Sequence, residues 1–303
     1  MRDNFIKKLI EIAKNDHRVV LLTADLGFSV LEEFANEFPS RFFNVGVSEQ
    51  NMIGIATGLA ESGFIPFTYS IAPFSLLRPY EFIKNGPILH NLPVRIIAIG
   101  PGFEYGNLGA THHLIEDIAV TRIFPNLSIY SPINSNNAMD LLENSYQEKN
   151  PIYYRIGKNK KSLTDNCQFT STENVIQLSK FDNPVCVFGI GSIAEEIMQF
   201  LQNYDKKISS YIITKIDNNI HSNLLPIIKL YKHIVTIEAH YINGGIGSII
   251  AEIIAENQLP IKLHRLGVNK ITDGIFGDSD FMHKKHNISS GDILNVVEKL
   301  FNK

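Results

Sequence analysis

The fold of this chain is decided by one stretch, which reads Arg41-Phe42-Phe43-Asn44-Val45-Gly46-Val47-Ser48-Glu49-Gln50-Asn51-Met52-Ile53-Gly54-Ile55-Ala56-Thr57-Gly58-Leu59-Ala60. A short apolar run reaches a glycine and gives way to a helical pattern. Ser48 is of a type preferred at a helix N-cap, so Glu49 should fall in the first turn. Glycine costs a helix interior roughly 1 kcal/mol relative to alanine, so Gly54 and Gly58 predict a buried helix packed closely against another backbone. Glu49 then either satisfies free backbone donors or has a chemical role.

The alternation of apolar runs and helical patterns extends through the first half of the chain. Besides the strand at Phe42, strands are expected at residues 19–23, 64–70, 93–100, 127–130 and 151–156. Helices are expected at residues 5–13, 31–38, 74–90, 114–124 and 136–146, with Ser29 as the N-cap of the second. Strands that are apolar throughout are typical of parallel sheets covered on both faces, so this half should be an α/β domain.

Functional side chains follow several of the expected strands. Active sites of parallel sheets lie beyond the carboxyl ends of the strands. These positions are taken by Asp25, Glu49, Ser70, the loop 101–112 and Arg155. We therefore expect these residues to converge on one edge of the sheet.

The second half repeats the strand–helix rhythm on a smaller scale. Strands are expected at residues 185–188, 210–213, 233–237 and 262–266, and helices at 193–204 and 246–255. A polar stretch without periodicity, residues 157–174, separates the halves. The predicted fold class is therefore α/β, with two three-layer domains built on parallel sheets, residues 1–165 and 180–303.

Composition excludes several classes of function. With 303 residues, 44% hydrophobic and 19% charged, the chain has the composition of a globular protein. A net charge of −3 provides no basic field for nucleic acid or an acidic membrane surface, and no apolar run approaches the ~20 residues of a membrane span. The two cysteines, Cys167 and Cys186, lack metal-type spacing and favour a cytoplasmic location.

Two glycine-rich turns in the second half have two interpretations. Gly189-Ile190-Gly191-Ser192 follows an expected strand and opens a helix, as in a dinucleotide fingerprint, with Asp217 near the position of a ribose-binding acid. Such turns are also common at plain strand–helix junctions, which is the interpretation we favour. Gly244-Gly245-Ile246-Gly247 is likewise most simply a tight helix entry.

The loop from Gly100 to His113 is more informative. Its four glycines allow main chain to approach a ligand closely, and its paired histidines titrate near neutrality. A metal site is the rival interpretation, but neither a cysteine nor a third histidine lies nearby in the sequence.

Two segments together carry a family resemblance. Phe43-Asn44-Val45-Gly46-Val47-Ser48-Glu49-Gln50-Asn51-Met52 and Gly109-Ala110-Thr111-His112-His113-Leu114-Ile115-Glu116-Asp117 resemble the transketolase family, and more narrowly its carboxy-terminal half made as a separate subunit. The resemblance covers essentially the whole chain. It implies a thiamine diphosphate pyrimidine-binding domain followed by a transketolase C-terminal-like domain, acting as a transferase of two-carbon ketol units from a ketose or oxo acid donor to an aldehyde.

The resemblance also implies residue roles. Glu49 would be catalytic and would hydrogen-bond the pyrimidine ring nitrogen, while His112 would bind substrate oxygens and assist proton transfer. Burial disfavours an ionised carboxylate and a helix start favours it, so the sequence leaves the protonation state of Glu49 open.

The remaining cofactor residues implied by the resemblance are Asp25, Phe74, Ile71 and Arg78. The residues implied for the phosphate end of a sugar phosphate are Arg2, Ser29 and Arg155. For three of these residues the sequence also allows a non-functional interpretation: core packing for Phe74, a flexible terminus for Arg2 and a surface ion pair for Arg155.

Three departures from the family pattern refine these expectations. Ile71 takes the place of a second aromatic ring, and Leu108 that of an aspartate that binds substrate hydroxyls. Leu108 therefore predicts a modified or deoxygenated sugar, a 2-oxo acid donor, or a nucleotide-linked sugar acceptor. The chain contains no Gly-Asp-Gly motif, so the diphosphate and Mg²⁺ should be held by a partner subunit in an α2β2 heterotetramer.

Two other functions remain open from the sequence. The β subunit of a 2-oxoacid dehydrogenase shares the two-domain plan and the glutamate, although Thr111-His112-His113 favours transketolase. A non-catalytic regulatory or scaffold subunit would keep the fold, although retention of Glu49, His112 and Arg155 argues against it.

Overall fold

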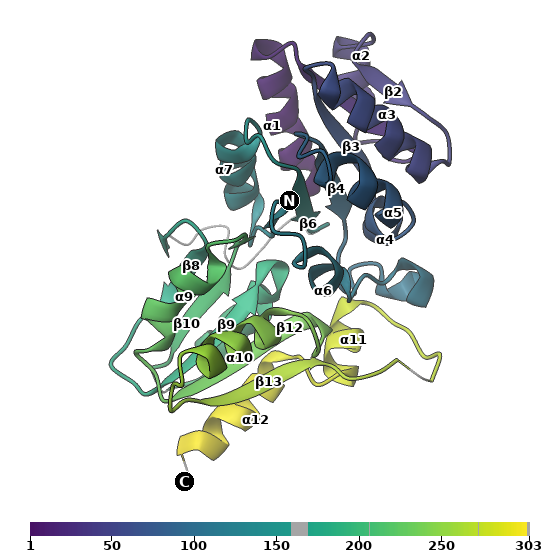
Figure 1. The fold of residues 1–303 in the computed structure, drawn as a ribbon. Coiled ribbons are helices and arrows are strands. Elements are labelled where there is room, and N and C mark those ends of the chain that lie inside the picture. Colours follow the sequence, from purple (N-terminus) through teal and green to yellow (C-terminus); the bar gives the residue numbers. More distant parts are fainter. Residues whose placement is uncertain (159–168, 206, 272, 302–303) are drawn as a thin grey trace. The chain divides into compact units, whose positions relative to one another are not determined.

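The computed structural model describes residues 1–158, 169–205, 207–271 and 273–301. The chain forms two compact units (Figure 1). The first comprises Met1–Pro101 and Phe124–Lys161, and the second Gly102–Ile123 and Ser162–Lys303. Cys167 and most of the polar stretch 157–174 lie outside the described residues, so the domain limits 1–165 and 180–303 stay a prediction. No helix in the described ranges is long and apolar enough to cross a membrane.

The first unit is built on a parallel sheet, as expected. Its strands lie in the order β5-β6-β4-β3-β1-β2, and every pairing between them is parallel. Their bounds are β1 Val19–Thr23, β2 Phe42–Asn44, β3 Ile65–Ile71, β4 Arg95–Ile99, β5 Ser128–Tyr130 and β6 Ile152–Ile156. The inner strands are buried along almost their whole length, which explains their uninterrupted apolar sequence.

Helices of the first unit flank this sheet. They are α1 Arg2–Asn15, α2 Glu32–Glu37, α3 Glu49–Glu61, α4 Ala72–Leu76, α5 Tyr80–Ile83 and α7 Ser135–Ser145. The apolar side chains that predicted a helix over residues 5–13 are buried on one side of α1, which packs against α7. The expected helix 74–90 is divided into α4, α5 and a π-helical turn at Lys84–Ile88. Pro79 and Pro87 lack the N–H that a continuous helix needs, which accounts for the division.

Two expectations about helix starts and packing are wrong. Ser29 does not cap α2, whose N-cap is Leu31; Ser29 lies in the preceding turn with φ +63°, and its N–H donates to Glu32 Oε1 at 2.7 Å. Among the residues that the structure describes, no backbone packs against Gly54 or Gly58, since a Cβ added at either would meet nothing within 4 Å. Helix α3 buries only the face that carries Glu49, Met52, Ile53, Ala56 and Ala60.

The second unit contains a mixed sheet. Its strand order is β13-β12-β9-β10-β8-β7, with bounds β7 Thr170–Ser171, β8 Val175–Ser179, β9 Val185–Ile190, β10 Ser209–Ile213, β12 His233–Tyr241 and β13 Lys262–Val268. The four strands predicted from sequence pair in parallel. Sequence analysis missed β8, which is antiparallel to both its neighbours and only partly buried. A two-residue strand, β11 (Lys215–Ile216), follows β10.

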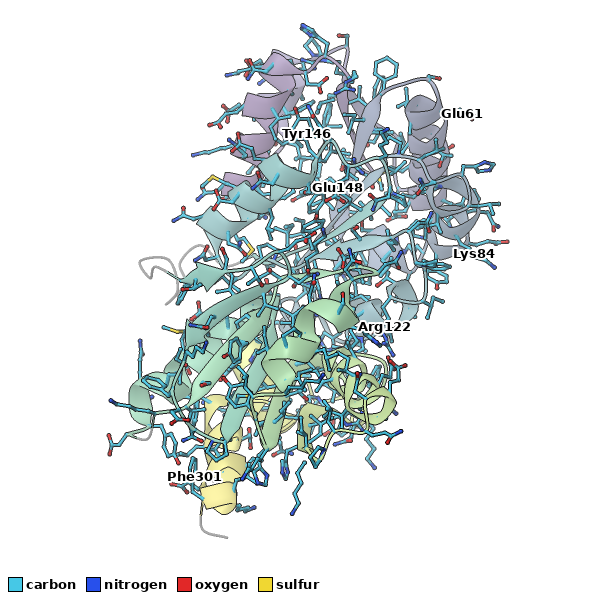
Figure 2. The ribbon with its side chains drawn as sticks, turned by 60° about the vertical axis from the view of Figure 1, so that its left-hand side comes forward. Glu61, Lys84, Arg122, Tyr146, Glu148 and Phe301 are labelled. Carbon is cyan, nitrogen blue, oxygen red and sulfur yellow. The ribbon has the colours of Figure 1, made fainter. Side chains whose placement is uncertain are left out.

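Helices of the second unit include one from the middle of the chain. They are α6 Asp117–Thr121, α8 Ala194–Asn203, α9 Ile220–Ile228, α10 Ile246–Glu256, α11 Ser279–Lys285 and α12 Ser290–Phe301. Arg122, labelled in Figure 2, forms a bidentate ion pair with Glu252 of α10 at 2.5 and 2.8 Å. The N–H of Ala119 donates to Nε2 of His240 at 3.2 Å. These contacts bind residues 102–123 to the second unit.

Candidate active site

Strand register brings several of the expected residues to one edge of the first sheet. Thr23 is paired with both Asn44 and Tyr69, and Ala98 with both Ser70 and Arg155. Asp25 and Glu49 therefore lie at the carboxyl edge with Ser70 and Arg155, as expected, and Ile71 lies there too. The convergence of the loop 101–112 on this edge stays a prediction. Ser70 and Arg155 lie within their strands, with exposed fractions of 0% and 3%. At ~4.8 Å per strand, the three strand spacings between β1 and β6 separate the ends of this edge by about 14 Å.

Arg78 links Glu49 to Phe74, and all three are predicted cofactor residues. The carboxylate is 2% exposed at the first residue of α3, and its Oε1 accepts a hydrogen bond from Nη1 of Arg78 at 2.9 Å. The guanidinium carbon of Arg78 lies 3.8 Å from the centroid of the Phe74 ring. The structure thus places a buried acid, an arginine and an aromatic ring in one contiguous cluster.

Local sequence explains this cluster. Phe74 and Arg78 are four residues apart, a spacing that puts side chains on the same side of a helical turn. Ser48 precedes α3, as predicted, although its side chain makes no capping hydrogen bond. Glu49 is the first residue of α3, and its carboxylate is paired with Arg78.

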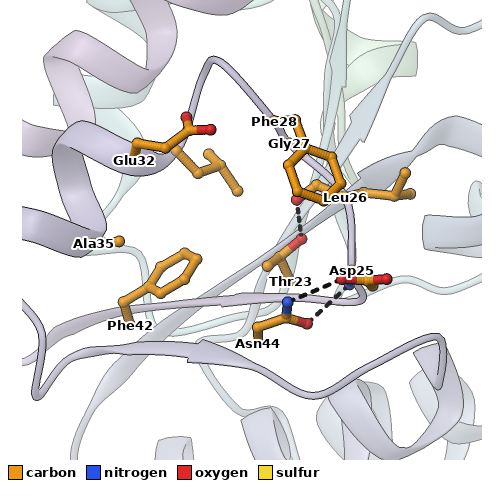
Figure 3. A pocket seen from close by; sticks show the side chains of 10 residues that line it. Thr23, Asp25, Leu26, Gly27, Phe28, Glu32, Ala35, Phe42 and Asn44 are labelled. Atoms are coloured by element: carbon orange, nitrogen blue, oxygen red, sulfur yellow. Dashed lines mark hydrogen bonds between the residues drawn. The ribbon is translucent and has the colours of Figure 1, made fainter.

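Asp25 is held by a residue that sequence analysis did not identify. Asp25 has φ +56°, a region that Asp and Asn tolerate better than most side chains. Its N–H donates to Oδ1 of Asn44 at 3.0 Å, and Nδ2 of Asn44 donates to Oδ1 of Asp25 at 3.2 Å (Figure 3). The only available signal was that Asn44 is the polar residue at the end of an apolar strand.

A pocket of about 150 Å³ opens beside the Asp25–Asn44 pair (Figure 3). It is lined by Thr23, Asp25, Leu26, Gly27, Phe28, Leu31, Glu32, Ala35, Phe42 and Asn44. The Thr23 hydroxyl donates to the carbonyl oxygen of Leu26 at 2.8 Å, which fixes the turn that forms one wall. The pocket is mostly apolar, with Thr23, Asp25 and Asn44 on one side and the carboxylate of Glu32 on the other (Figure 3).

The residues expected at the phosphate end lie on three separate elements. Arg2 is in the first turn of α1, where its Nε donates to Oδ1 of Asp3 at 2.8 Å. Ser29 is exposed in the turn before α2, and Arg155 is buried in β6. A buried arginine at a strand end needs polar partners. Arg155 therefore does not form a surface ion pair, which was the non-functional interpretation.

The histidine loop belongs to the second unit. Two hydrogen bonds between Gly102 and Leu114, of 2.7 and 3.1 Å, close its base. Inside it, two 3-10 turns at Gly106–Leu108 and Ala110–His112 present Leu108, which is 55% exposed, and His112. Nδ1 of His112 lies 3.0 Å from the hydroxyl of Thr111.

His113, next along the loop, faces the protein interior. Its ring is 4% exposed, and burial lowers its pKa from the ordinary value. Glu116, which follows in the same motif, is partly buried, and burial raises the pKa of its carboxyl group although the N–H of Ile115 donates to it. The two neighbouring histidines therefore occupy different environments, and His112 is the more accessible.

The glycine turns of the second unit are packing features. A Cβ at Gly189 would lie 2.7 Å from side-chain atoms of both Ile193 and Ile197. At the start of α10, the buried carboxylate of Glu238 already accepts hydrogen bonds from the N–H groups of Ile246 and Gly247, at 2.7 and 3.0 Å. A side chain of the chain itself therefore takes the place that an anionic ligand would use, and the tight-turn interpretation is supported.

Neither a ribose-binding acid nor a metal-type cluster is found at the positions that these alternatives require in the described ranges. Asp217, the candidate ribose-binding acid, forms an ion pair with Lys215 at 3.1 Å and accepts from the N–H of Asn219 at 3.0 Å. Within the described ranges, no three or more His, Cys, Asp and Glu side chains gather as a metal site. Through Arg78, the buried carboxyl group of Glu49 and the aromatic ring of Phe74 belong to one cluster, which combines a hydrogen-bonding acid with an aromatic face.

Comparison with known proteins agrees with this geometry. The family "Transketolase, pyrimidine binding domain" matches residues 1–162, which is more than half of the chain. A subunit of the apulose-4-phosphate transketolase of Actinobacillus succinogenes is 29% identical over 97% of this chain and 96% of its own. The 6-deoxy-6-sulfo-D-fructose transketolase subunit SqwH of a Clostridium species (strain MSTE9) is 28% identical over 99% and 94%.

A solved structure shares the whole fold. It is described as a split gene transketolase, inactive beta4 tetramer, and it superposes with a TM-score of 0.82 at 26% identity, covering 98% of this chain and 96% of that chain. Both units are therefore included in the match. The chain belongs to the transketolase family, in which it corresponds to the separately encoded carboxy-terminal half.

Proposed function

We propose that this chain is the β-like subunit of a two-component transketolase, which transfers a two-carbon ketol unit from a ketose or oxo acid donor to an aldehyde. The observation that carries the proposal is Glu49, a carboxyl group 2% exposed at a helix start and in one cluster with Arg78 and Phe74. Thiamine diphosphate, the cofactor of this family, supplies the carbanion chemistry when bound.

The residues of this cluster have complementary tasks. Glu49 would hydrogen-bond the pyrimidine ring nitrogen, and its burial would keep water from competing for that bond. Phe74 offers a ring face for stacking, which Arg78 covers in this structure. Arg78 orients the carboxyl group through Oε1. Asp25, fixed by Asn44, and Ile71 complete the cofactor side at the same sheet edge.

The substrate is an anionic, modified sugar. Arg155 would bind the anionic end through its bidentate fork, and Arg2 and Ser29 are the further contacts that the family resemblance implies. His112 binds substrate oxygens, whereas Leu108 cannot hydrogen-bond a hydroxyl. The names of the two relatives fit this pattern, since one substrate carries a phosphate and the other a sulfo group on a deoxy sugar.

A partner subunit completes the cofactor site. The sequence has no Gly-Asp-Gly motif, so the partner would bind the diphosphate and Mg²⁺, and we propose a cytoplasmic α2β2 assembly. One surface of this chain supports a partner contact: the outer face of α3 carries Gly54 and Gly58 with open space above them. Val47 and Ile55 beside this face are 72% and 37% exposed. Glycine here allows the backbone of another chain to approach closely.

The test is turnover with the partner subunit supplied. We expect the mixture, with thiamine diphosphate and Mg²⁺, to transfer two-carbon units within a panel of phosphorylated, sulfonated and deoxy sugars and oxo acids. Activity that depends on a lipoyl carrier instead would assign the chain to the 2-oxoacid dehydrogenases. Full activity of the partner without this chain would make it a regulatory or scaffold subunit.

A further inference from the structure

The loop that carries Leu108 and His112 depends on one carbonyl group. The oxygen of Gly106 accepts the N–H of Gly109 at 3.1 Å, which forms the first 3-10 turn, and it also lies 3.1 Å from Nε2 of His113. The N–H of His112 in turn donates to the oxygen of Gly109 at 2.9 Å. One side chain, His113, thus ties the end of the loop to its first turn.

The hydrogen bond to Gly106 determines which ring nitrogen of His113 carries the proton. A carbonyl oxygen only accepts, so Nε2 must carry the proton. In the neutral ring Nδ1 is then an acceptor, and Nδ1 is buried without a hydrogen-bond partner among the described residues. A phenylalanine would fill the same space without the cost of an unpaired buried nitrogen. The hydrogen bond to Gly106 therefore gives a reason for histidine at this position.

Aromatic contacts hold the ring in place. The His113 ring meets the ring of Phe103 edge to face, with centroids 5.1 Å apart, and that of Phe276 in the same manner at 5.2 Å. Phe103 is stacked on His286, with centroids 5.2 Å apart and an angle of 7°. His113 is thereby packed between its own loop and a segment more than 160 residues later in the sequence.

Residues 276–286, here named the support segment, hold the loop at further points. The hydroxyl of Ser279 donates to the oxygen of Phe103 at 2.9 Å. Gly106 approaches the backbone of Gly277 so closely that a Cβ on Gly106 would collide with its carbonyl oxygen. His283 is paired with Glu196 of α8 at 2.8 Å, which fixes the support segment within the second unit.

We propose that His113 is a positioning residue for substrate recognition. Its neutral ring, clamped between Phe103 and the support segment, donates to Gly106 and so sets the two turns that present Leu108 and His112. The support segment gives the second unit a role in the site, namely to hold the loop. This inference rests on the proposed function, because the importance of the loop position depends on sugar contacts made by His112.

The experiment separates the hydrogen bond from the packing. His113→Phe keeps an aromatic ring and removes the donor, and His113→Gln keeps a donor and removes the ring. His233→Phe is the matched control. Nδ1 of His233 is also buried with no hydrogen-bond partner in the described part of the second unit, but His233 lies outside the loop and the support segment. Hydrogen exchange of the amides in residues 103–114 is measured on the isolated full chain, and donor KM and kcat on the reconstituted enzyme.

We expect exchange at Gly109 and His112 to rise about tenfold in His113→Phe, as expected for loss of one hydrogen bond. His113→Gln should restore part of the protection, and the control should match wild type. In the reconstituted enzyme, His113→Phe should raise the donor KM about tenfold with a smaller change in kcat, because an interaction common to ground and transition states is lost. The affinity for thiamine diphosphate should not change.

The outcomes are distinguishable. Unchanged exchange in His113→Phe, or an equal rise in the control, overturns the positioning role. Faster exchange with an unchanged donor KM in an active enzyme overturns the link to substrate recognition. Faster exchange combined with a wild-type mixture that transfers no two-carbon unit supports the positioning role and rejects the proposed function.

Discussion

Glu49 and the His112 loop are held in place in opposite ways. Glu49 begins α3, which a four-residue turn joins to β2, and its partner Arg78 lies 29 residues away within the same unit. The loop is held by Ser279, which is 176 residues from its partner Phe103, and by the aromatic rings of the support segment. The acid is thus fixed by regular secondary structure and the loop by tertiary packing. Substitutions at the two should have different consequences.

The largest effect is expected at Glu49. Glu49→Gln keeps the shape of the side chain and an oxygen that accepts from Arg78, but it replaces the carboxyl group with an amide that cannot take part in proton transfer. Loss of a positioned acid–base group costs roughly 10²–10⁴ in rate, so turnover of the reconstituted enzyme should fall about a thousandfold. The thermal midpoint of the variant serves as the control for folding. Retention of most of the wild-type rate would show that Glu49 has no catalytic role and only stabilises the start of α3. Glu49 and the loop would then no longer differ in their importance for catalysis.

The second prediction concerns the partner subunit. If the Glu49 cluster holds only the pyrimidine part of the cofactor, as we propose, the isolated chain should be inactive. It should bind thiamine diphosphate at least about a hundredfold more weakly than the assembly, a difference of about 2.7 kcal/mol. Calorimetry with and without the partner measures this, and it should show Mg²⁺ dependence only with the partner. Tight binding by the chain alone would contradict the divided site.

A smaller effect is expected at the loop, where Leu108 departs from the family pattern. Leu108→Asp adds an acceptor for a donor hydroxyl without disturbing the core, because the side chain is 55% exposed. The ratio of kcat/KM for an ordinary ketose phosphate over the best modified donor should rise about tenfold, the value of one polar contact. The idea of a modified substrate fails if xylulose 5-phosphate is already the best donor and the substitution leaves the ratio unchanged.

The smallest effect is a pH dependence of the loop support. Burial, together with nearby His112, lowers the pKa of His113 below 6.5 despite the hydrogen bond to Gly106. Burial and Lys285 do the same for the pKa of His286, against the opposing charge of Asp273. Both rings are neutral in the folded state. Their contribution to the free energy of unfolding is therefore complete above pH 6.5 and is lost as the pH falls through the lowered pKa values.

Urea unfolding of the isolated chain between about pH 7.5 and 5 measures this contribution. The free energy of unfolding should decrease toward acid pH in wild type, and the slope should be smaller in His113→Phe. Glu196 does not contribute over this range: burial acts to raise its pKa, but the contact with His283 leaves that pKa below 4.5. An identical slope in wild type and variant would show that His113 titrates normally and that its buried environment is wrongly assigned.

Much of the fold followed from the sequence alone. Strands β1, β4 and β6 are uninterrupted apolar runs, and the polar residues after such strands had to meet at one edge of a parallel sheet. Glu49 could be found because a serine before a glycine-rich helix marks the helix start without any distant information. The family assignment followed from short motifs around Glu49 and His112, and the comparisons bear it out. The roles of the individual site residues stay predictions.

Only the tertiary structure decided the rest, because those features depend on contacts between distant residues. Ser29 and Glu32 are the exception, since they lie three residues apart at the spacing of a capping box, yet the helix begins at Glu32 with Leu31 as its N-cap. The glycines of α3 were expected to be covered, but burial is a property of the packed chain, which leaves that face open. His113 has the same local sequence signal as His112, and only packing against Phe103 and Phe276 makes one histidine a support and leaves the other accessible.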